Sequence, residues 1–148
     1  MKTRFATITG CAFLAVLVFT GCGLKKFSAG GIPPEVEAVV GTVTEDIAQE
    51  NYDKVYNESS DLWKKDVTAE QSAETLKSLH SKLGKVESRT VHTASELENS
   101  GGALKGHSFI VSYQTKFERG EAMETFTLVE ENGHWKLARY LVNSTALK

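Results

Sequence analysis

The sequence predicts an α+β fold in which two to three N-terminal helices pack on a four-stranded antiparallel sheet. Two observations carry this prediction. Apolar residues recur at helical spacing as far as Gly84 and alternate with polar residues from Lys85 onward. Short links rich in turn-forming residues separate the alternating segments, as in an antiparallel meander. Helices followed by such a sheet form an α+β domain.

The composition is that of one ordinary folded domain. The chain has 148 residues, which is enough for a single core. Its 17 basic and 19 acidic residues give a net charge of −2 without a long run of either sign. This balance argues against a nucleic-acid partner. Charged residues make up 24% of the chain, a share typical of a globular domain rather than a disordered tail. We therefore expect a single domain over residues 35–148.

The N-terminal segment has the layout of a secretory signal. Lys2 and Arg4 precede an apolar run over residues 12–19, and Gly21 stands just before Cys22. The run is too short to cross a bilayer, because crossing takes about 20 apolar residues. These features predict a cleaved signal peptide rather than a permanent transmembrane helix.

Residues 19–22, Phe-Thr-Gly-Cys, resemble the cleavage site of a bacterial lipoprotein signal, with phenylalanine in the place where leucine is usual. The resemblance implies cleavage between Gly21 and Cys22, so that residues 1–21 are removed and the Cys22 thiol carries diacylglycerol. The other cysteine, Cys11, follows too short an apolar segment to serve in this way. The alternative is an ordinary signal peptide cut nearby, which leaves a free thiol at Cys22.

Residues 22–34 are rich in glycine and proline and lack periodicity, so they predict a flexible tether that begins with the lipidated cysteine. The lipoprotein resemblance implies an exported domain anchored to a bacterial membrane. Gly23 stands where an aspartate commonly retains lipoproteins at the inner membrane of double-membraned bacteria. In a host with an outer membrane, the expected location is therefore the periplasmic side of that membrane.

Three helical segments are predicted in the first half of the domain. The first covers residues 35–50 and has Pro34 at a first helical position. A short helix and a turn follow over residues 52–63. Thr68 and Gln71 have the spacing of a capping box that opens the last helix, and Gly84 is placed to end it. The apolar stripe of the first helix consists of Val36, Val39, Val40, Val43 and Ile47.

Four strands are predicted in the second half, over residues 86–97, 104–118, 122–130 and 134–142. The dipeptide Asn132-Gly133 between the last two is a strong hairpin signal. The fourth strand breaks the alternation of apolar and polar residues. Either a bulge near Ala138 or Arg139 re-aims its later residues, or this strand is buried on both faces. In the second strand one face, expected to pack on the helices, carries Phe109, Val111, Tyr113 and Phe117.

Several segments of this domain resemble a family of small exported bacterial domains of unknown function. They are residues 83–89 (Leu-Gly-Lys-Val-Glu-Ser-Arg), 109–117, 124–129 and 135–140. Such domains resemble the cystatin-like, nuclear transport factor two-like fold, in which helices lean on a strongly curved antiparallel sheet, often around a conical cavity. The resemblance covers roughly residues 34–147. It implies a fold, but it brings no established activity and no functional residues.

The patterns of common metal and catalytic sites are missing from the sequence. The histidines lack the paired spacing of metal ligands, and we expect no metal and no cofactor. No Gly-x-Ser-x-Gly elbow occurs, and Cys22 is the last thiol of the chain. We interpret His80, on the apolar stripe of the last helix, as a core or boundary residue. The other histidines are His92, His107 and His134. Glutamates near the strand turns are interpreted as a solvated acidic edge: Glu118, Glu121, Glu124, Glu130 and Glu131.

We therefore expect a lipid-anchored, non-enzymatic bacterial envelope protein whose domain binds an unidentified protein partner or small ligand. The alternative is a small enzyme of isomerase or dehydratase type with its site inside the cavity. Tyr56, Trp63, Tyr113 and Tyr140 would line such a cavity, or they are plain core aromatics. A sealed apolar interior favours the first hypothesis, whereas a ligand-sized opening with a buried carboxylate or histidine beside a tyrosine favours the enzyme. A homodimer through the exposed sheet face is a third alternative.

Overall fold

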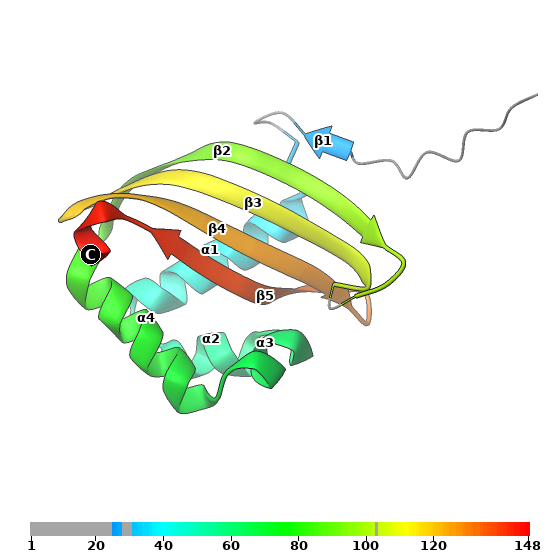
Figure 1. Cartoon of the computed structure of the whole chain (residues 1–148), viewed down its shortest axis with the longest axis horizontal. Helices are drawn as coiled ribbons and strands as arrows, with labels where there is room; N and C mark the ends of the chain where they lie inside the picture. The colour runs from blue at the N-terminus through cyan, green and yellow to red at the C-terminus, as the bar shows by residue number, and fades with distance from the viewer. Residues whose placement is uncertain (1–24, 28–30, 103) are drawn as a thin grey trace, which may run out of the picture.

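The computed structural model describes residues 25–27, 31–102 and 104–148, so the predicted signal peptide and Cys22 lie outside the described residues. The architecture is α+β, as the sequence predicts. An antiparallel sheet with the strand order β1-β2-β3-β4-β5 curves over a layer of helices (Figure 1). The helices lie on one side of the sheet, and the opposite side is its outer face (Figure 1).

Four α-helices occur in the described residues: α1 (Pro34–Ala48), α2 (Tyr52–Glu58), α3 (Asp61–Asp66) and α4 (Ala69–Leu83). The short helix and turn predicted in the middle form two helices, because the Ser60 hydroxyl accepts a hydrogen bond from the Trp63 backbone N–H and starts α3. The capping box at the start of α4 is confirmed in both its hydrogen bonds. None of the described helices has the length and apolar character needed to cross a membrane.

The four predicted strands are confirmed as β2 (Val86–Asn99), β3 (Gly106–Phe117), β4 (Gly120–Glu131) and β5 (His134–Asn143). Asn132 and Gly133 join β4 to β5 with φ angles of 53° and 78°, the left-handed values that a tight hairpin requires. The bulge predicted in β5 is also confirmed. Thr127 pairs with Arg139 while Leu128 pairs with Leu137, so Ala138 is the extra residue.

A short strand, β1 (Lys25–Phe27), lies inside the segment predicted as a tether. It pairs with β2 between Ala94 and Glu96, at the edge of the sheet. An edge strand presents free backbone N–H and C=O groups, and these groups pair readily with a further strand. Ile32, near the end of the same segment, packs into the hydrophobic core. The described part of this segment is therefore attached to the domain at two points.

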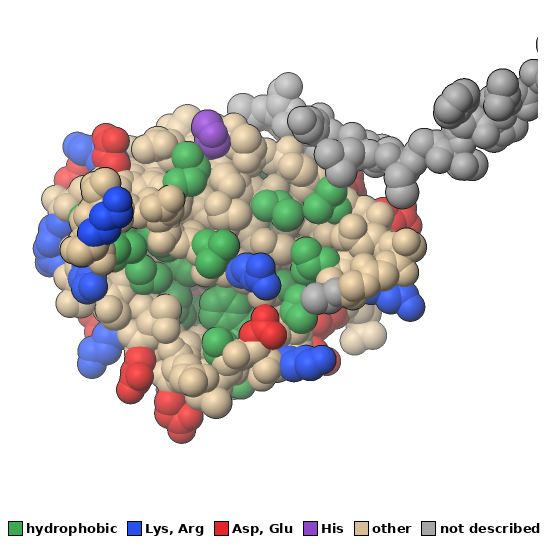
Figure 2. Space-filling model, in the orientation of Figure 1, with side chains coloured by type: hydrophobic (Ala, Val, Ile, Leu, Met, Phe, Trp, Pro, Cys, Tyr) green, Lys and Arg blue, Asp and Glu red, His purple; other side chains and the backbone are tan. Residues whose placement is uncertain are grey.

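The hydrophobic core lies between the inner face of the sheet and the helices. Phe109 and Phe126 are fully buried at its centre, on the neighbouring strands β3 and β4. On the face shown in Figure 2, basic and acidic side chains are interspersed, mainly around the margin, while hydrophobic side chains gather toward the middle. This face therefore offers no extended patch of one charge. The core also includes Val36, Val40, Val55, Leu76, Val111, Leu128 and Leu137.

Candidate functional site

A buried ion pair lies on the inner face of the sheet. Glu124 projects from the middle of β4, and its side chain is 1% exposed. The Nε atom of Arg89, on β2, donates a hydrogen bond to Glu124 Oε2 at 2.7 Å. A carboxylate withdrawn from water in this way needs partners that replace its hydration. Arg89 is one of these partners, and residues of the neighbouring strands supply the others.

Two hydroxyl groups complete the surroundings of the Glu124 carboxylate. The Thr115 hydroxyl, on β3, donates to Oε2, and the Tyr140 hydroxyl, on β5, donates to Oε1 at 2.6 Å. The Arg89 guanidinium also lies over the rings of Tyr113 and Phe126, at 5.5 and 5.8 Å from their centroids. One carboxylate therefore receives donors from three other strands, β2, β3 and β5.

The tyrosines of this cluster keep their protons over a wider pH range than free tyrosine does. Burial raises the pKa of Tyr140 well above its ordinary value of 10.0, and the negative charge of Glu124 raises it further. Arg89 acts in the opposite direction and does not outweigh these two causes. Burial likewise raises the pKa of Tyr113. Tyr140 therefore acts as a neutral hydrogen-bond donor to Glu124 at physiological pH.

The position of Glu124 corrects the interpretation that the glutamates near the turns form a solvated acidic edge. Glu124 has the same parity along β4 as Phe126 and Leu128, and alternation therefore turns it toward the core. This shared parity is the feature of the sequence from which the burial of Glu124 could have been predicted. Glu118 accepts a hydrogen bond from the Lys85 backbone N–H, and Glu130 is one of the acidic partners of His107.

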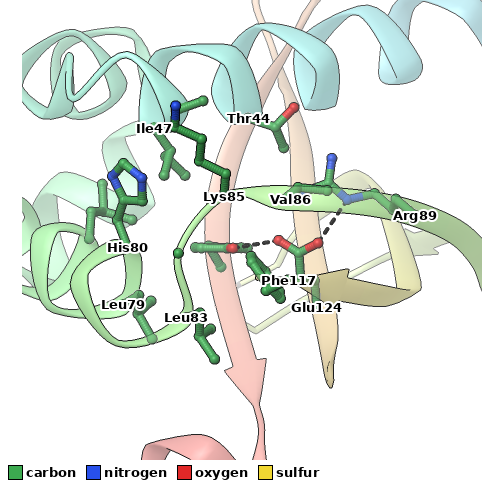
Figure 3. A pocket seen from close by; sticks show the side chains of 14 residues that line it. Thr44, Ile47, Leu79, His80, Leu83, Lys85, Val86, Arg89, Phe117 and Glu124 are labelled. Atoms are coloured by element: carbon green, nitrogen blue, oxygen red, sulfur yellow. Dashed lines mark hydrogen bonds and ion pairs between the residues drawn. The ribbon is translucent and has the colours of Figure 1, made fainter. Parts of the chain in front are cut away.

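A narrow cavity adjoins the ion pair, beneath α1 and beside α4 (Figure 3). Its volume is about 40 Å³, which is room for about three water molecules. Arg89, Glu124 and Tyr140 form its polar end, and their polar groups bond to one another. The rest of the lining is mainly apolar and includes Ile47, Ala48, Leu76, Leu79, Leu83, Val86 and Phe117.

The four aromatic residues predicted to line a cavity lie in different places. Tyr140 lines the cavity, and Tyr113 lies in the core beside Arg89. Trp63, on α3, donates from its ring N–H to the Ser72 hydroxyl of α4 at 3.2 Å. Tyr56 lies on α2. The structure thus brings Tyr113 and Tyr140 to the Glu124 cluster, and it places Trp63 and Tyr56 in the helical layer.

The histidines do not converge. His80 is half-buried and shares a hydrogen bond with the Tyr52 hydroxyl at 3.2 Å, as expected of a boundary residue. His107 contacts the carboxylates of Glu96 and Glu130 at the other end of the inner face. His92 and His134 are exposed. Within the described parts of the chain, no group of three or more histidine, cysteine or acidic side chains has the arrangement of a metal site.

Comparison with known proteins gives a family but no activity. Residues 41–140 match the family model described as a protein of unknown function (DUF4019). The match covers α1 from its middle, the other α-helices and the strands β2 to β5, and it ends within β5. No curated protein matches the chain.

Proposed function

Because the chain belongs to the DUF4019 family of proteins of unknown function, we propose its function from its own residues. It is a non-enzymatic bacterial envelope protein, anchored to the membrane by lipid on Cys22, whose α+β domain binds a small ligand at the cavity. The observation that carries the non-enzymatic role is that both oxygens of the Glu124 carboxylate accept hydrogen bonds from the protein itself.

Glu124 is the buried carboxylate beside the cavity, and its oxygens already have partners. Arg89 and Thr115 donate to Oε2, and Tyr140 donates to Oε1. A general base must come within hydrogen-bond reach of the substrate proton that it removes. Glu124 would have to give up one of these donors first. The arrangement therefore supports a structural carboxylate at the end of a binding cavity rather than a catalytic one.

The anchor in this proposal holds one edge of the sheet close to the membrane. Cys22 precedes the first residue of β1, Lys25, by three positions. Three residues span about 10 Å at most, at roughly 3.3 Å per residue. A lipidated Cys22 would therefore keep the β1–β2 edge within about 10 Å of the lipid head groups.

Mass spectrometry of the protein purified gently from its own membranes tests the anchor. We expect the mature mass to begin at Cys22 and to include acyl chains. Replacing the cysteine (Cys22→Ala) should abolish the acyl mass and release the protein from the membrane fraction. The matched control Cys11→Ala removes the other thiol and should leave lipidation intact. An unlipidated mass that begins at another residue would contradict the proposal.

A small enzyme is the second candidate, because a buried carboxylate lies beside a tyrosine at the cavity. The cavity volume of about 40 Å³ is below the roughly 300–1,000 Å³ of usual ligand pockets, so the cavity cannot enclose a whole substrate, and a bound ligand would place only one end inside it. Native mass spectrometry separates the two candidates. A copurifying molecule that keeps its mass on incubation with the protein supports a binding role. A molecule that is converted under the same conditions supports the enzyme.

A further inference from the structure

A larger surface groove adjoins the cavity beside Glu124. The two share His80, Gly84 and Lys85, at the end of α4 and the start of β2. The groove has a volume of about 310 Å³ and is also lined by Tyr52 and Arg119. The mainly apolar cavity and the open groove thus lie next to each other, with Lys85 at the junction between them. In Figure 3 the Lys85 side chain extends from the start of β2 toward α1.

The groove carries more positive than negative charge. Its basic side chains are Lys77, Lys85 and Arg119, and its acidic ones are Glu50 and Glu118. Arg119 donates to the Ser81 carbonyl oxygen, which is a neutral acceptor. Across the described residues, no ion pair involves the Lys85 ammonium group. Lys85 is exposed and therefore offers a charge that can meet an anion.

Apart from Lys85 at the junction, the charged side chains that line the cavity are paired with each other. The positive charge of Arg89 is paired with Glu124, and both oxygens of Glu124 accept hydrogen bonds. The remaining walls are mainly the apolar side chains of α1, α4 and the strands. A charged group that entered beyond Lys85 would lose its hydration, and the charges of Arg89 and Glu124 there already neutralise each other. The interior therefore favours an apolar group, while the junction favours an anionic one.

From this contrast we infer that the site binds a small amphipathic anion, with a slender apolar end in the cavity and the anionic head group at Lys85. The inference rests on the proposed binding role and specifies its ligand class. About 40 Å³ admits only the tip of an alkyl chain, so the rest of the molecule lies along the groove. Carboxylates and phosphates both fit this description, because an ammonium group binds either as a point charge.

Four probes test this inference on the purified full chain by titration under native mass spectrometry. Hexanoate and hexyl phosphate carry the same tail with the two kinds of anionic head. Hexylammonium reverses the charge, and acetate removes the tail. We expect at least one hexyl anion to bind, and we expect hexylammonium and acetate to bind at least about tenfold more weakly. The hexyl anion that binds more tightly identifies the head group.

Two variants locate the site. Lys85→Gln should weaken binding of the hexyl anion by about tenfold or more, since it removes the charge at the junction. Lys82→Gln is the matched control, because Lys82 is an exposed lysine three positions earlier that lines neither the cavity nor the groove. Both substitutions are on the surface and should leave folding unchanged.

The inference is overturned if neither hexyl anion binds, if hexylammonium or acetate binds as tightly as the anion, or if the two lysine variants behave alike. After such a result, the proposed binding role still holds if a different small molecule copurifies with the protein from its membranes. The binding role itself fails if the membrane-bound protein copurifies with no small molecule.

Discussion

At the scale of single residues, Glu124 connects more of the sheet than any backbone hydrogen bond does. Its carboxylate receives donors from Arg89 on β2, Thr115 on β3 and Tyr140 on β5, and it belongs to β4. Buried charge pairs contribute little to net stability when compared with apolar residues, but the loss of one partner is costly. The loss of one member of the cluster should therefore cost more stability than the intact cluster contributes.

The substitution Glu124→Gln should lower the free energy of unfolding by about 3 kcal/mol, because it leaves the partly buried Arg89 without a counter-charge. Urea denaturation of the purified chain measures this change. Glu121→Gln is the matched control on the same strand, since Glu121 is exposed, and it should change stability by less than about 0.5 kcal/mol. Equal effects of the two substitutions would mean that the buried pair has no special role.

At the scale of elements, the ends of α4 were predictable because each depends on local chemistry. Thr68 and Gln71 exchange the two hydrogen bonds of a capping box at its start. Gly84 at its end has a φ of 77°, a value that favours glycine. The bulge in β5 was predicted as one of two alternatives, since the alternation changes parity there. The structure selected it by pairing Leu137 and Arg139 with adjacent residues of β4.

Replacing Gly84 and Gly41 by alanine should change the stability of the protein in opposite directions. At Gly84 a Cβ atom would lie 2.9 Å from the Cβ of Glu118, and the positive φ adds strain. Gly84→Ala should therefore destabilise the protein by about 1–3 kcal/mol. Gly41 lies inside α1 with no atom within 4 Å of an added Cβ, so Gly41→Ala should stabilise it by about 0.5–1 kcal/mol. Thermal unfolding of both variants would reveal a wrong sign in either case.

At the scale of the whole molecule, the inner face of the sheet has a second polar cluster at its other end. His107 on β3 contacts Glu96 on β2 and Glu130 on β4, and its ring lies 4.7 Å from that of Trp135 on β5. Burial acts to lower the pKa of His107, but the two carboxylates outweigh it, so the pKa is raised above 6.5. Protonated His107 therefore stabilises the folded state.

This raised pKa predicts a pH dependence of stability. The contribution of His107 is fully present below about pH 6.5, the ordinary value, and is lost as the pH rises through the higher value of the folded state. The loss of stability on raising the pH from about 5.5 to 8.5 should be smaller in His107→Gln than in the original protein. His92→Gln, at an exposed histidine, is the matched control. Urea denaturation across this range would contradict the assignment if both variants behaved alike.

One further prediction concerns the outer face of the sheet. A homodimer through this face remains a prediction, and sedimentation at high protein concentration tests it. Leu141 is 55% exposed on β5. The alternation that turns Tyr140 toward the core turns Leu141 to the other side.

The sequence by itself determined the α+β class, the order of the long strands, the capping of α4 and the hairpin at Asn132-Gly133, because each follows from local periodicity or turn chemistry. It also carried the predicted lipid anchor at Cys22. Only the tertiary structure decided that Arg89 meets Glu124 and that a cavity opens beside them. Parity shows which face of its own strand a residue occupies, whereas contact across strands depends on register. In β2 that register shifts at His92, and this shift sets Arg89 opposite Thr115.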